Sequence, residues 1–506
     1  MLPRPPLKQQ NRPKSDTPSL DDDGLSQANH IIKNLSIFQM PKIDMNQDIG
    51  IQSSSESTYS TEKYGKLEEL PLLSSVTEDK FNDLMRRKLK QCKIICNFSN
   101  HLSDVKNRNI KMGYLQEILK CVSKPKYFKL FEPETFDVFF EMIKSNIIRS
   151  IPPIPPLAKV PMIGDDIKDT IYEATWPHLE IVYQIFQKFL ESPLMNPQVF
   201  NQYFDKSFIT NILALFDSPD QKERDSLKMI LHKLYLRFLS KRIIIRQSIS
   251  NILYTFIYET KYFCGISELL EIMISIVNGF IIPLKEEHKD FLINILLPLH
   301  TSYFLHLFHT NLFYCVLQYI QKDPDLIPII VNKLLKLWPV SSSTKEILFI
   351  NQLGRILEIM SEEQFVGLIH DGLFTQIGKS LSSNNFQVSE TTLLLWKIDR
   401  FVQLITLHAK EIFPIICPYL YQTGTNHWNT GIRNLAVSVI RICMETSRSE
   451  FDKFSKSMKK IRKIEIQKIE NQKKSWMVLI ENASKSDKDI HFNQTSIDEL
   501  KTAFSV

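Results

Sequence analysis

The sequence consists, over most of its length, of amphipathic segments in which apolar residues recur at every third or fourth position. This spacing places apolar side chains on one face of an α-helix, and it continues from Thr77 to about Ala483. The expected helices include Trp176–Leu190, Phe208–Phe216, Leu227–Leu239, Ile243–Ile257, Ile266–Phe280, Phe291–Phe304, Leu326–Trp338, Ile347–Met360, Phe365–Leu381, Thr391–Leu407 and Ile432–Met444. Short breaks are expected at Ser192-Pro193, Asp217-Ser218-Pro219, Asp323-Pro324, Trp338-Pro339, Pro414 and Pro418.

The spacing of these helices favours an all-α solenoid. One helix pair takes about 40 residues, which is typical of HEAT-like or armadillo-type repeats. The repeats share no clear consensus, so a large irregular helical bundle is the alternative architecture. The chain has 13 glycines among 506 residues, which favours helices over hairpins and argues against glycine-rich phosphate loops.

Composition divides the chain into three parts. Residues 1–75 are rich in Pro, Ser, Asp, Gln and Asn and predict a disordered tail. Residues 76–483 form the predicted solenoid, whose first helix should begin at Thr77, with the threonine side chain as its cap. Residues 484–506 predict a polar C-terminal tail. The proline-rich stretch from Ile151 to Asp166 cannot be helical and predicts a long connection within the solenoid.

Composition also limits the functional class. The net charge of +6 is mild for this length and does not by itself indicate a nucleic-acid partner. The seven cysteines are scattered and no apolar leader follows Met1, which predicts free thiols in a cytoplasmic or nuclear protein. The longest nearly apolar run, Leu269–Leu284, is too short to span a bilayer, so no membrane span is expected.

No motif of a catalytic, nucleotide or metal site is found. The sequence lacks the phosphate-binding, nucleophile-elbow, zinc-protease and EF-hand patterns, so neither an enzyme nor a bound cofactor is expected. Cys92 and Cys96 would share one face of a helix, but no second pair of ligands completes a zinc site. Buried thiols are the preferred interpretation, and no metal site is predicted.

A lysine-rich stretch, Phe451–Lys474, keeps helical spacing of its apolar residues and predicts a long amphipathic helix with a basic face. Such a face could bind nucleic acid, act as a nuclear localisation signal or simply be solvated. No aromatic residues lie among the lysines, so base stacking is not supported, and a solvated face is preferred.

Basic and aromatic residues are concentrated in the stretch Leu227–His300, on one helix or on two helices joined at Ser240-Lys241. The residues that would face one surface are His232, Tyr235, Arg242, Arg246, Ile272, Ile276, Lys285 and His288. Adjacent solenoid helices line one surface, so this set could form apolar pockets with cationic rims for a short acidic peptide. The alternative, which periodicity alone favours, is that the isoleucines are core and the basic residues are ordinary surface.

Many short stretches match one known family in the same order along the chain. They include Ala174-Thr-Trp-Pro-His-Leu179, Phe189-Leu-Glu-Ser-Pro193, Leu215-Phe-Asp-Ser218, Phe256-Ile-Tyr-Glu-Thr260, Gly265-Ile-Ser-Glu-Leu-Leu-Glu-Ile272, Pro283-Leu-Lys-Glu-Glu-His-Lys289, Leu296-Leu-Pro-Leu-His300 and His427-Trp-Asn429. In these stretches the sequence resembles the B′ (B-prime, or B56) regulatory subunit family of protein phosphatase 2A. The resemblance extends from about Phe81 to Ala483.

The resemblance implies a superhelix of HEAT-like repeats that is not itself enzymatic. Such a subunit would bind the phosphatase scaffold and catalytic subunits and capture clients through Leu-x-x-Ile-x-Glu motifs. The groove residues implied by the resemblance are His232, Lys233, Tyr235, Arg242, Arg246, Glu271, Ile272, Ile276, Lys285 and His288. Arg246 and His232 would suit the motif glutamate, and Tyr235 and the two isoleucines would suit the apolar anchors.

Two departures from the family pattern affect recognition. Lys233 stands where the family usually has arginine, which keeps the charge but loses the bidentate fork. An acidic loop that would face the catalytic subunit is reduced here to Asp165, Asp166, Asp169 and Glu173. The alternative function is an α-solenoid scaffold or transport adaptor unrelated to phosphatase.

Overall fold

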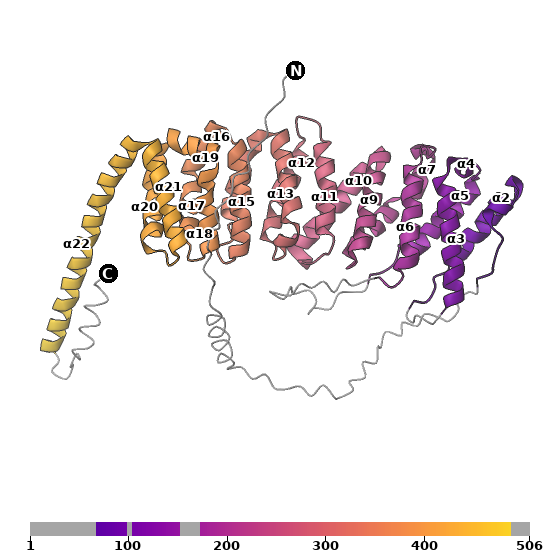
Figure 1. Cartoon of the computed structure of the whole chain (residues 1–506), viewed down its shortest axis with the longest axis horizontal. Helices are drawn as coiled ribbons and strands as arrows, with labels where there is room; N and C mark the ends of the chain where they lie inside the picture. Colours follow the sequence, from indigo (N-terminus) through magenta and orange to yellow (C-terminus); the bar gives the residue numbers. More distant parts are fainter. Residues whose placement is uncertain (1–66, 99–103, 152–172, 487–506) are drawn as a thin grey trace, which may run out of the picture. The chain divides into compact units, whose positions relative to one another are not determined.

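The computed structural model of the chain describes residues 67–98, 104–151 and 173–486, and every regular element within these ranges is a helix (Figure 1). The structure therefore confirms the all-α prediction. The predicted tails lie outside the described residues, except for 67–75 and 484–486.

The first part of the fold precedes the candidate groove. Its helices are α2 (Glu78–Cys92), α3 (Val105–Ser123), α4 (Pro125–Phe128), α5 (Pro133–Ile147), α6 (Trp176–Glu191), α7 (Pro197–Phe200), α8 (Lys206–Ala214) and α9 (Gln221–Arg237). The side chains of Asp205 and Asp220 accept hydrogen bonds from early amides of α8 and α9, which fixes where these helices begin. Thr77 precedes α2 as expected, but its side chain makes no capping hydrogen bond, so that detail of the prediction is wrong.

The remaining helices continue the array to residue 486. They are α10 (Arg242–Thr255), α11 (Ile266–Asn278), α12 (Glu286–Phe291), α13 (Leu305–Lys322), α14 (Ile327–Lys336), α15 (Ser343–Ile359), α16 (Glu362–His370), α17 (Leu373–Leu381), α18 (Phe386–Leu393), α19 (Asp399–Leu407), α20 (Ala409–Asn426), α21 (Thr430–Thr446) and α22 (Arg448–Ser486). Short 3-10 turns cover Leu73–Ser75, Asn201–Tyr203, Leu215–Asp217, Leu239–Lys241, Pro298–Thr301, Pro324–Leu326 and Leu394–Lys397, and π-helical turns cover Phe256–Thr260 and Leu292–Leu296.

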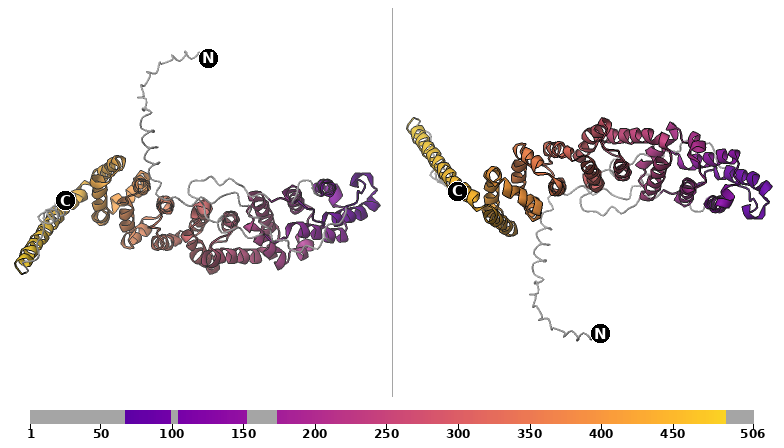
Figure 2. Two further views of the ribbon diagram at one scale, coloured as in Figure 1. Left: turned by 90° about the horizontal axis from the view of Figure 1, so that it is seen from below. Right: turned by 90° about the horizontal axis from the view of Figure 1, so that it is seen from above.

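Packing follows the order of a solenoid. In one row, α3, α6, α9, α11, α13, α15, α18 and α21 each pack against the next, and in both views of Figure 2 neighbouring helices lie side by side. Hydrogen bonds between repeats join residues about one repeat apart: Asn311 to Ser267 at a separation of 44, Thr423 to Leu381 at 42 and Trp428 to Asn384 at 44. These separations agree with the predicted period.

The prediction that Pro414 and Pro418 mark breaks is wrong, because both lie inside α20. A proline within a helix costs about 3 kcal/mol and leaves the carbonyl four residues earlier without a donor. Those carbonyls belong to Lys410 and Pro414, which are exposed and can be hydrated. The opposite face buries five large side chains, and this burial stabilises the helix: Ile412, Phe413, Ile416, Cys417 and Leu420.

Breaks also occur where the apolar period alone predicted continuous helix. The expected helix 365–381 is divided between α16 and α17 at Gly372, whose φ of 94° favours glycine. The expected helix 391–407 is divided between α18 and α19 at the 3-10 turn before Ile398. The expected helix 291–304 becomes a π-helical turn and then a 3-10 turn that begins at Pro298.

The described ends of the array also pack in detail. The backbone amides of Leu67 and Leu70 donate to Asn107 Oδ1 at 3.1 Å and to the Tyr114 hydroxyl at 2.7 Å, so residues 67–75 belong to the packed domain rather than to the tail predicted to end at 75. At the other end, Phe451 and Phe454 on α22 are buried against α20. Further along α22, Trp476 is 51% exposed.

Candidate functional site

The candidate groove begins where α9 ends and α10 begins. The 3-10 turn Leu239–Lys241 separates the two helices, so of the two predicted arrangements the structure has the pair joined at Ser240-Lys241. Although Tyr235 and the two arginines lie on different helices, they are in direct contact. Arg242 Nε donates to the Tyr235 carbonyl at 2.9 Å, and Arg246 donates to the Tyr235 hydroxyl at 3.3 Å.

The two guanidinium groups are held by neutral partners. The Arg242 guanidinium lies 5.1 Å from the centre of the Tyr235 ring, a cation–π arrangement of about 0.5–1 kcal/mol at an exposed site. No carboxylate of the described residues lies within 4 Å of either arginine. Each guanidinium has five N–H donors, so both retain donors for an acidic ligand.

A cavity of about 210 Å³ lies between Arg246, one of these two arginines, and residues of α12. Arg246 and His288 both line it, together with Ile243, Met273, Phe280 and Tyr319 among others. Lys285 is exposed at the start of α12. The structure therefore brings Arg246 and His288 together at one cavity, although they come from separate helices. Ile243, which is 57% exposed, was missed by the sequence-based prediction because its position on α10 depends on the break at Ser240-Lys241.

His288 has an unusual environment. Its ring stacks on Phe280, with centroids 3.6 Å apart and planes within 1°. Burial lowers the pKa of His288 below its usual 6.5; Glu287 opposes this change, and Arg246 and Lys285 reinforce it. The ring is therefore neutral at pH 7.

Ile272 and Ile276 are core residues. Each is only 2% exposed, and neither lines the cavity. For these two residues the structure agrees with the interpretation that periodicity alone favoured. Both belong to the hydrophobic core of the array, and Tyr235 is the partly exposed apolar group of the predicted set.

Lys233 and Glu271 are already engaged in ion pairs. Lys233 Nζ lies 2.6 Å from Glu191 Oε1, and Glu271 Oε2 lies 2.9 Å from Lys228 Nζ. The hydrogen bonds from Lys188 and Lys233 lower the pKa of Glu191. A ligand carboxylate would therefore compete with Glu191 for Lys233. His232 is half-buried on α9, and no hydrogen bond or ion pair joins it to another described residue.

Of the four predicted loop acids, only Glu173 lies within the described residues. Glu173 Oε2 accepts from Arg149 at 2.9 Å, and its other oxygen accepts from the Thr175 hydroxyl at 2.8 Å. Burial raises the pKa of Glu173, but Arg149 and Thr175 outweigh burial and lower it overall. Its carboxylate is thus held by the subunit itself. Asp165, Asp166 and Asp169 lie outside the described residues.

Arg149 belongs to a larger buried network that sequence reasoning missed. It binds both oxygens of Glu223, at 2.6 and 2.8 Å, and Glu223 also accepts from the Tyr183 hydroxyl at 2.8 Å and from Ser218 at 2.5 Å. Glu223 is fully buried. The network joins the end of α5 to α6 and to the first turn of α9, the helix that carries Tyr235.

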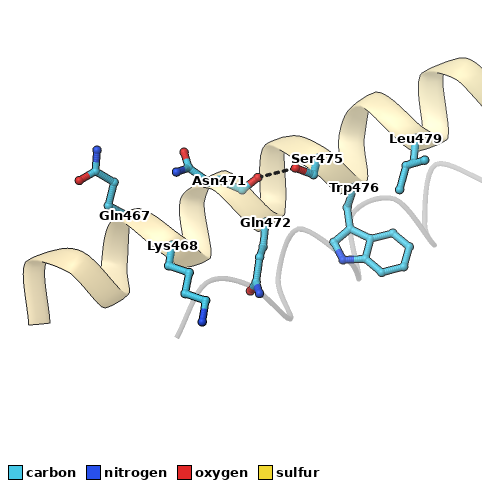
Figure 3. A pocket seen from close by; sticks show the side chains of 7 residues that line it. All are labelled: Gln467, Lys468, Asn471, Gln472, Ser475, Trp476 and Leu479. Atoms are coloured by element: carbon cyan, nitrogen blue, oxygen red, sulfur yellow. Dashed lines mark hydrogen bonds between the residues drawn. The ribbon is translucent and has the colours of Figure 1, made fainter. Parts of the chain in front are cut away.

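The described residues hold no group of three or more His, Cys, Asp or Glu side chains that could bind a metal ion. An open hollow of about 640 Å³ lies along α22, and the described residues that line it all belong to that helix (Figure 3). The residues are Gln467, Lys468, Asn471, Gln472, Ser475, Trp476 and Leu479. Ser475 donates to the Asn471 carbonyl at 3.0 Å, and this set offers no pair of acid and base.

Cys92 and Cys96 do not share a helix, because α2 ends at Cys92. All seven cysteines are free, and all but Cys264 are buried. Among the described helices, none alone has the length and apolarity to cross a membrane; the bent pair α19 and α20 passes that test only when its two helices are joined.

Comparisons with known proteins place the sequence beside one family. The family model described as "Protein phosphatase 2A regulatory B subunit (B56 family)" matches residues 70–483. The human protein phosphatase 2A 56 kDa regulatory subunit alpha isoform is 39% identical over 416 residues, which are 82% of this chain and 84% of that protein. The rabbit beta isoform is 39% identical over 407 residues, 80% of each chain.

Proposed function

The chain belongs to the B56 family of regulatory B subunits of protein phosphatase 2A, and on that premise we propose that it binds the phosphatase scaffold and catalytic subunits and recruits clients. The relatives are named as regulatory subunits, which points to a regulatory and non-catalytic role. The proposed clients carry short acidic motifs similar to Leu-x-x-Ile-x-Glu. The subunit would act in the cytoplasm, the nucleus or both.

The observation that carries the client-binding proposal is the Tyr235–Arg242–Arg246 cluster. Its cations are positioned by a carbonyl, a hydroxyl and a ring rather than by a carboxylate. A charged hydrogen bond from such a group to a ligand carboxylate contributes about 1.5–3 kcal/mol. The motif glutamate would bind Arg246, with His232 beside it, as the resemblance implies.

The apolar anchors of the motif need exposed apolar surface. Because Ile272 and Ile276 are nearly fully buried, we assign direct contact with the anchors to Tyr235 and Ile243 and leave the two α11 isoleucines in the core. This assignment changes the roles implied by the resemblance but keeps the groove in the same place.

Calorimetry with a Leu-x-x-Ile-x-Glu peptide tests client binding. Arg246→Ala and His232→Ala should each weaken binding by more than about tenfold, since about 1.4 kcal/mol corresponds to a factor of ten. Arg355→Ala is the matched control, because Arg355 is 66% exposed on α15 and, within the described part of the chain, forms an ion pair with Glu358 of its own helix alone. Unchanged affinity in both groove variants would refute the assignment of the groove.

Assembly is tested separately by affinity purification of the full chain. A phosphatase scaffold subunit and catalytic subunit should co-purify in stoichiometric amounts. Recovery of other partners without these two subunits would instead support the scaffold or transport-adaptor alternative. Mass spectrometry of the same sample would also identify the clients.

A further inference from the structure

The lysine-rich helix α22 carries the net charge of the whole chain. It contains eleven Lys and Arg residues but only five Asp and Glu residues. The complete sequence contains 62 and 56, which gives its net charge of +6. The excess positive charge of the chain is therefore the excess of this one helix, and the rest of the sequence is neutral in sum. Charge of one sign concentrated in one element attracts an anionic partner.

Most of α22 has no partner within the array. Phe451 and Phe454 are buried against α20, but none of the described side chains after Phe454 is buried. Among the described side chains of α22, the one ion pair joins Lys453 to Glu450. The lysines farther along the helix thus have no carboxylate partner in the described part of the chain, and their charge remains available to an external anion.

The same stretch of α22 has an exposed apolar face. At about 100° per residue, five apolar residues fall within an arc of about 140°: Ile466, Ile469, Trp476, Leu479 and Ile480. The first four are 42–58% exposed. Lys459 and Lys468 flank this arc on its two sides, and in Figure 3 Lys468 projects from the same side of the helix as Trp476 and Leu479. Exposed apolar residues grouped in this way indicate a binding surface.

The order of residues along this face favours a fluid surface over a rigid protein groove. Ile469 and Trp476 are two turns apart, and Gln472 and the partly buried Lys473 stand between them. A coiled-coil partner needs an apolar residue at each turn of the seam. A second copy of α22 would also bring two helices of the same charge together.

A bilayer surface rich in anionic lipids uses both features of the helix. Lysine stems lie along the apolar region while their ammonium groups reach the lipid headgroups, and a tryptophan ring lies at the same level. A nucleic-acid backbone would use the lysines alone and leave the apolar face in water. The combination of an apolar face and flanking lysines is typical of helices that lie in a membrane interface.

We propose that residues 456–486 of α22 form an interfacial helix that binds a membrane surface rich in anionic lipids. Ile469, Trp476 and Leu479 enter the boundary between headgroups and acyl chains, and Lys459 and Lys468 bind anionic headgroups on either side. The helix lies in the plane of the bilayer. This inference goes beyond the proposed function, since it uses no residue of the client groove; it would place the regulatory subunit next to clients at a membrane.

Vesicle flotation with the full chain tests the interfacial helix. Phosphatidylcholine vesicles that contain about one-third phosphatidylserine should bind the subunit at least about tenfold more tightly than vesicles of phosphatidylcholine alone, because each lysine near an anionic surface strengthens binding. The double variant Trp476→Gln, Leu479→Gln should bind the anionic vesicles more than about tenfold more weakly, since two inserted apolar side chains are lost. Both side chains are more than half exposed, so the variant keeps its fold.

The double variant Tyr303→Gln, Leu307→Gln is the matched control. These two side chains are 62% and 65% exposed at the start of α13, and their replacement should leave vesicle binding unchanged. Equal binding of neutral and anionic vesicles, or anionic binding that survives the loss of Trp476 and Leu479, would overturn the proposal. Binding of duplex DNA, or of calcium-loaded calmodulin as an acidic protein with an apolar groove, by a subunit that does not bind vesicles would overturn it as well.

Discussion

Two clusters of this solenoid both combine arginine with tyrosine, but only one of them pairs its arginine with carboxylates. In the first, Arg149 binds both oxygens of Glu223 and one of Glu173, and Tyr183 donates to Glu223 as well. In the second, the partners of Arg242 and Arg246 among the described residues are the carbonyl oxygens of Tyr235 and Leu236, the Tyr235 hydroxyl and the Tyr235 ring. The first cluster contains its own carboxylates, whereas the second has none.

The difference shows how one chemistry serves either stability or recognition. Buried charges that are fully paired fix the position of α9 against α5 and α6, and removal of one partner leaves the other charge uncompensated. Arginines held by hydrogen bonds and ring contacts to neutral groups are also fixed in position. Because their charge is not neutralised, they can still bind a carboxylate of a ligand. The closed network therefore positions α9, the helix that carries Tyr235 of the open cluster.

The largest expected effect comes from opening the closed network. Glu223→Leu should destabilise the subunit by about 3–5 kcal/mol, because it leaves the partly buried Arg149 without its main counter-charge. Hydrogen exchange should show the loss first in α6 and in the first turn of α9. Glu358→Gln, which breaks only an exposed ion pair with Arg355, should cost less than about 1 kcal/mol. Equal protection in both variants would show that the network does not stabilise this region.

Acid should weaken the solenoid through two buried histidines. Burial lowers the pKa of both His178 and His300 from 6.5 to about 4. The unfolded chain thus binds protons that the folded chain excludes, so stability is full above pH 6.5 and falls as the pH drops toward 4. Each histidine accounts for a loss of about 3 kcal/mol at most. Arg149 and Thr175 lower the pKa of Glu173 below its ordinary 4.5, so its ion pair persists through the upper part of this pH range.

Thermal melting between pH 7 and 4 tests the role of the two histidines. The double variant His178→Gln, His300→Gln starts from a lower stability, but its melting temperature should change much less between pH 6.5 and 4.5. His370→Gln is the control, since that side chain is 71% exposed, and it should keep the wild-type pH dependence. A double variant with the full wild-type slope would assign the acid sensitivity to other groups.

Giving the open cluster its own carboxylate should close it. Ser250 lies one turn after Arg246 on α10 and lines the same cavity, so Ser250→Glu places an acid within reach of the guanidinium. Binding of the acidic peptide should weaken by about five- to thirtyfold, which corresponds to about 1–2 kcal/mol. Ser248→Glu adds the same charge on another face of α10 and should weaken binding by less than twofold. Similar losses in both variants would mean that net charge, rather than pairing with Arg246, controls affinity.

The sequence predicted the open cluster better than the closed one, for a physical reason. Tyr235, Arg242 and Arg246 lie within twelve residues, so helical spacing and one turn bring them together. Arg149 and Glu223 are 74 positions apart, and no local pattern links them. The same limit hid Tyr319, which reaches the cavity from α13.

Helix boundaries show a related limit. The apolar period correctly predicted α6, α11 and α21, because each buries one continuous face. It passed over the break at Gly372, since the apolar positions continue on both sides. Pro414 and Pro418 wrongly predicted helix breaks, because the burial of the opposite face of α20 outweighs the free-energy cost of two prolines within the helix. Gly378 adds a constraint that no period reveals: a Cβ there would lie 2.2 Å from the ring of Tyr419.

The smallest expected effect concerns Lys233, whose charge is paired with a carboxylate, as in the closed network, but in a pair that is partly exposed. Its ammonium is 2.6 Å from Glu191 Oε1, and the Glu191 side chain is 43% exposed. An exposed pair of this kind contributes about 0.2–1 kcal/mol. Glu191→Gln should release Lys233 and tighten binding of the acidic peptide by about two- to fivefold, with a steeper dependence on salt. Glu358→Gln again serves as the control and should leave the peptide affinity unchanged. If Glu191→Gln also leaves the affinity unchanged, Lys233 does not reach the ligand, and the positive charge that the ligand meets comes from the other groove cations, such as Arg242 and Arg246.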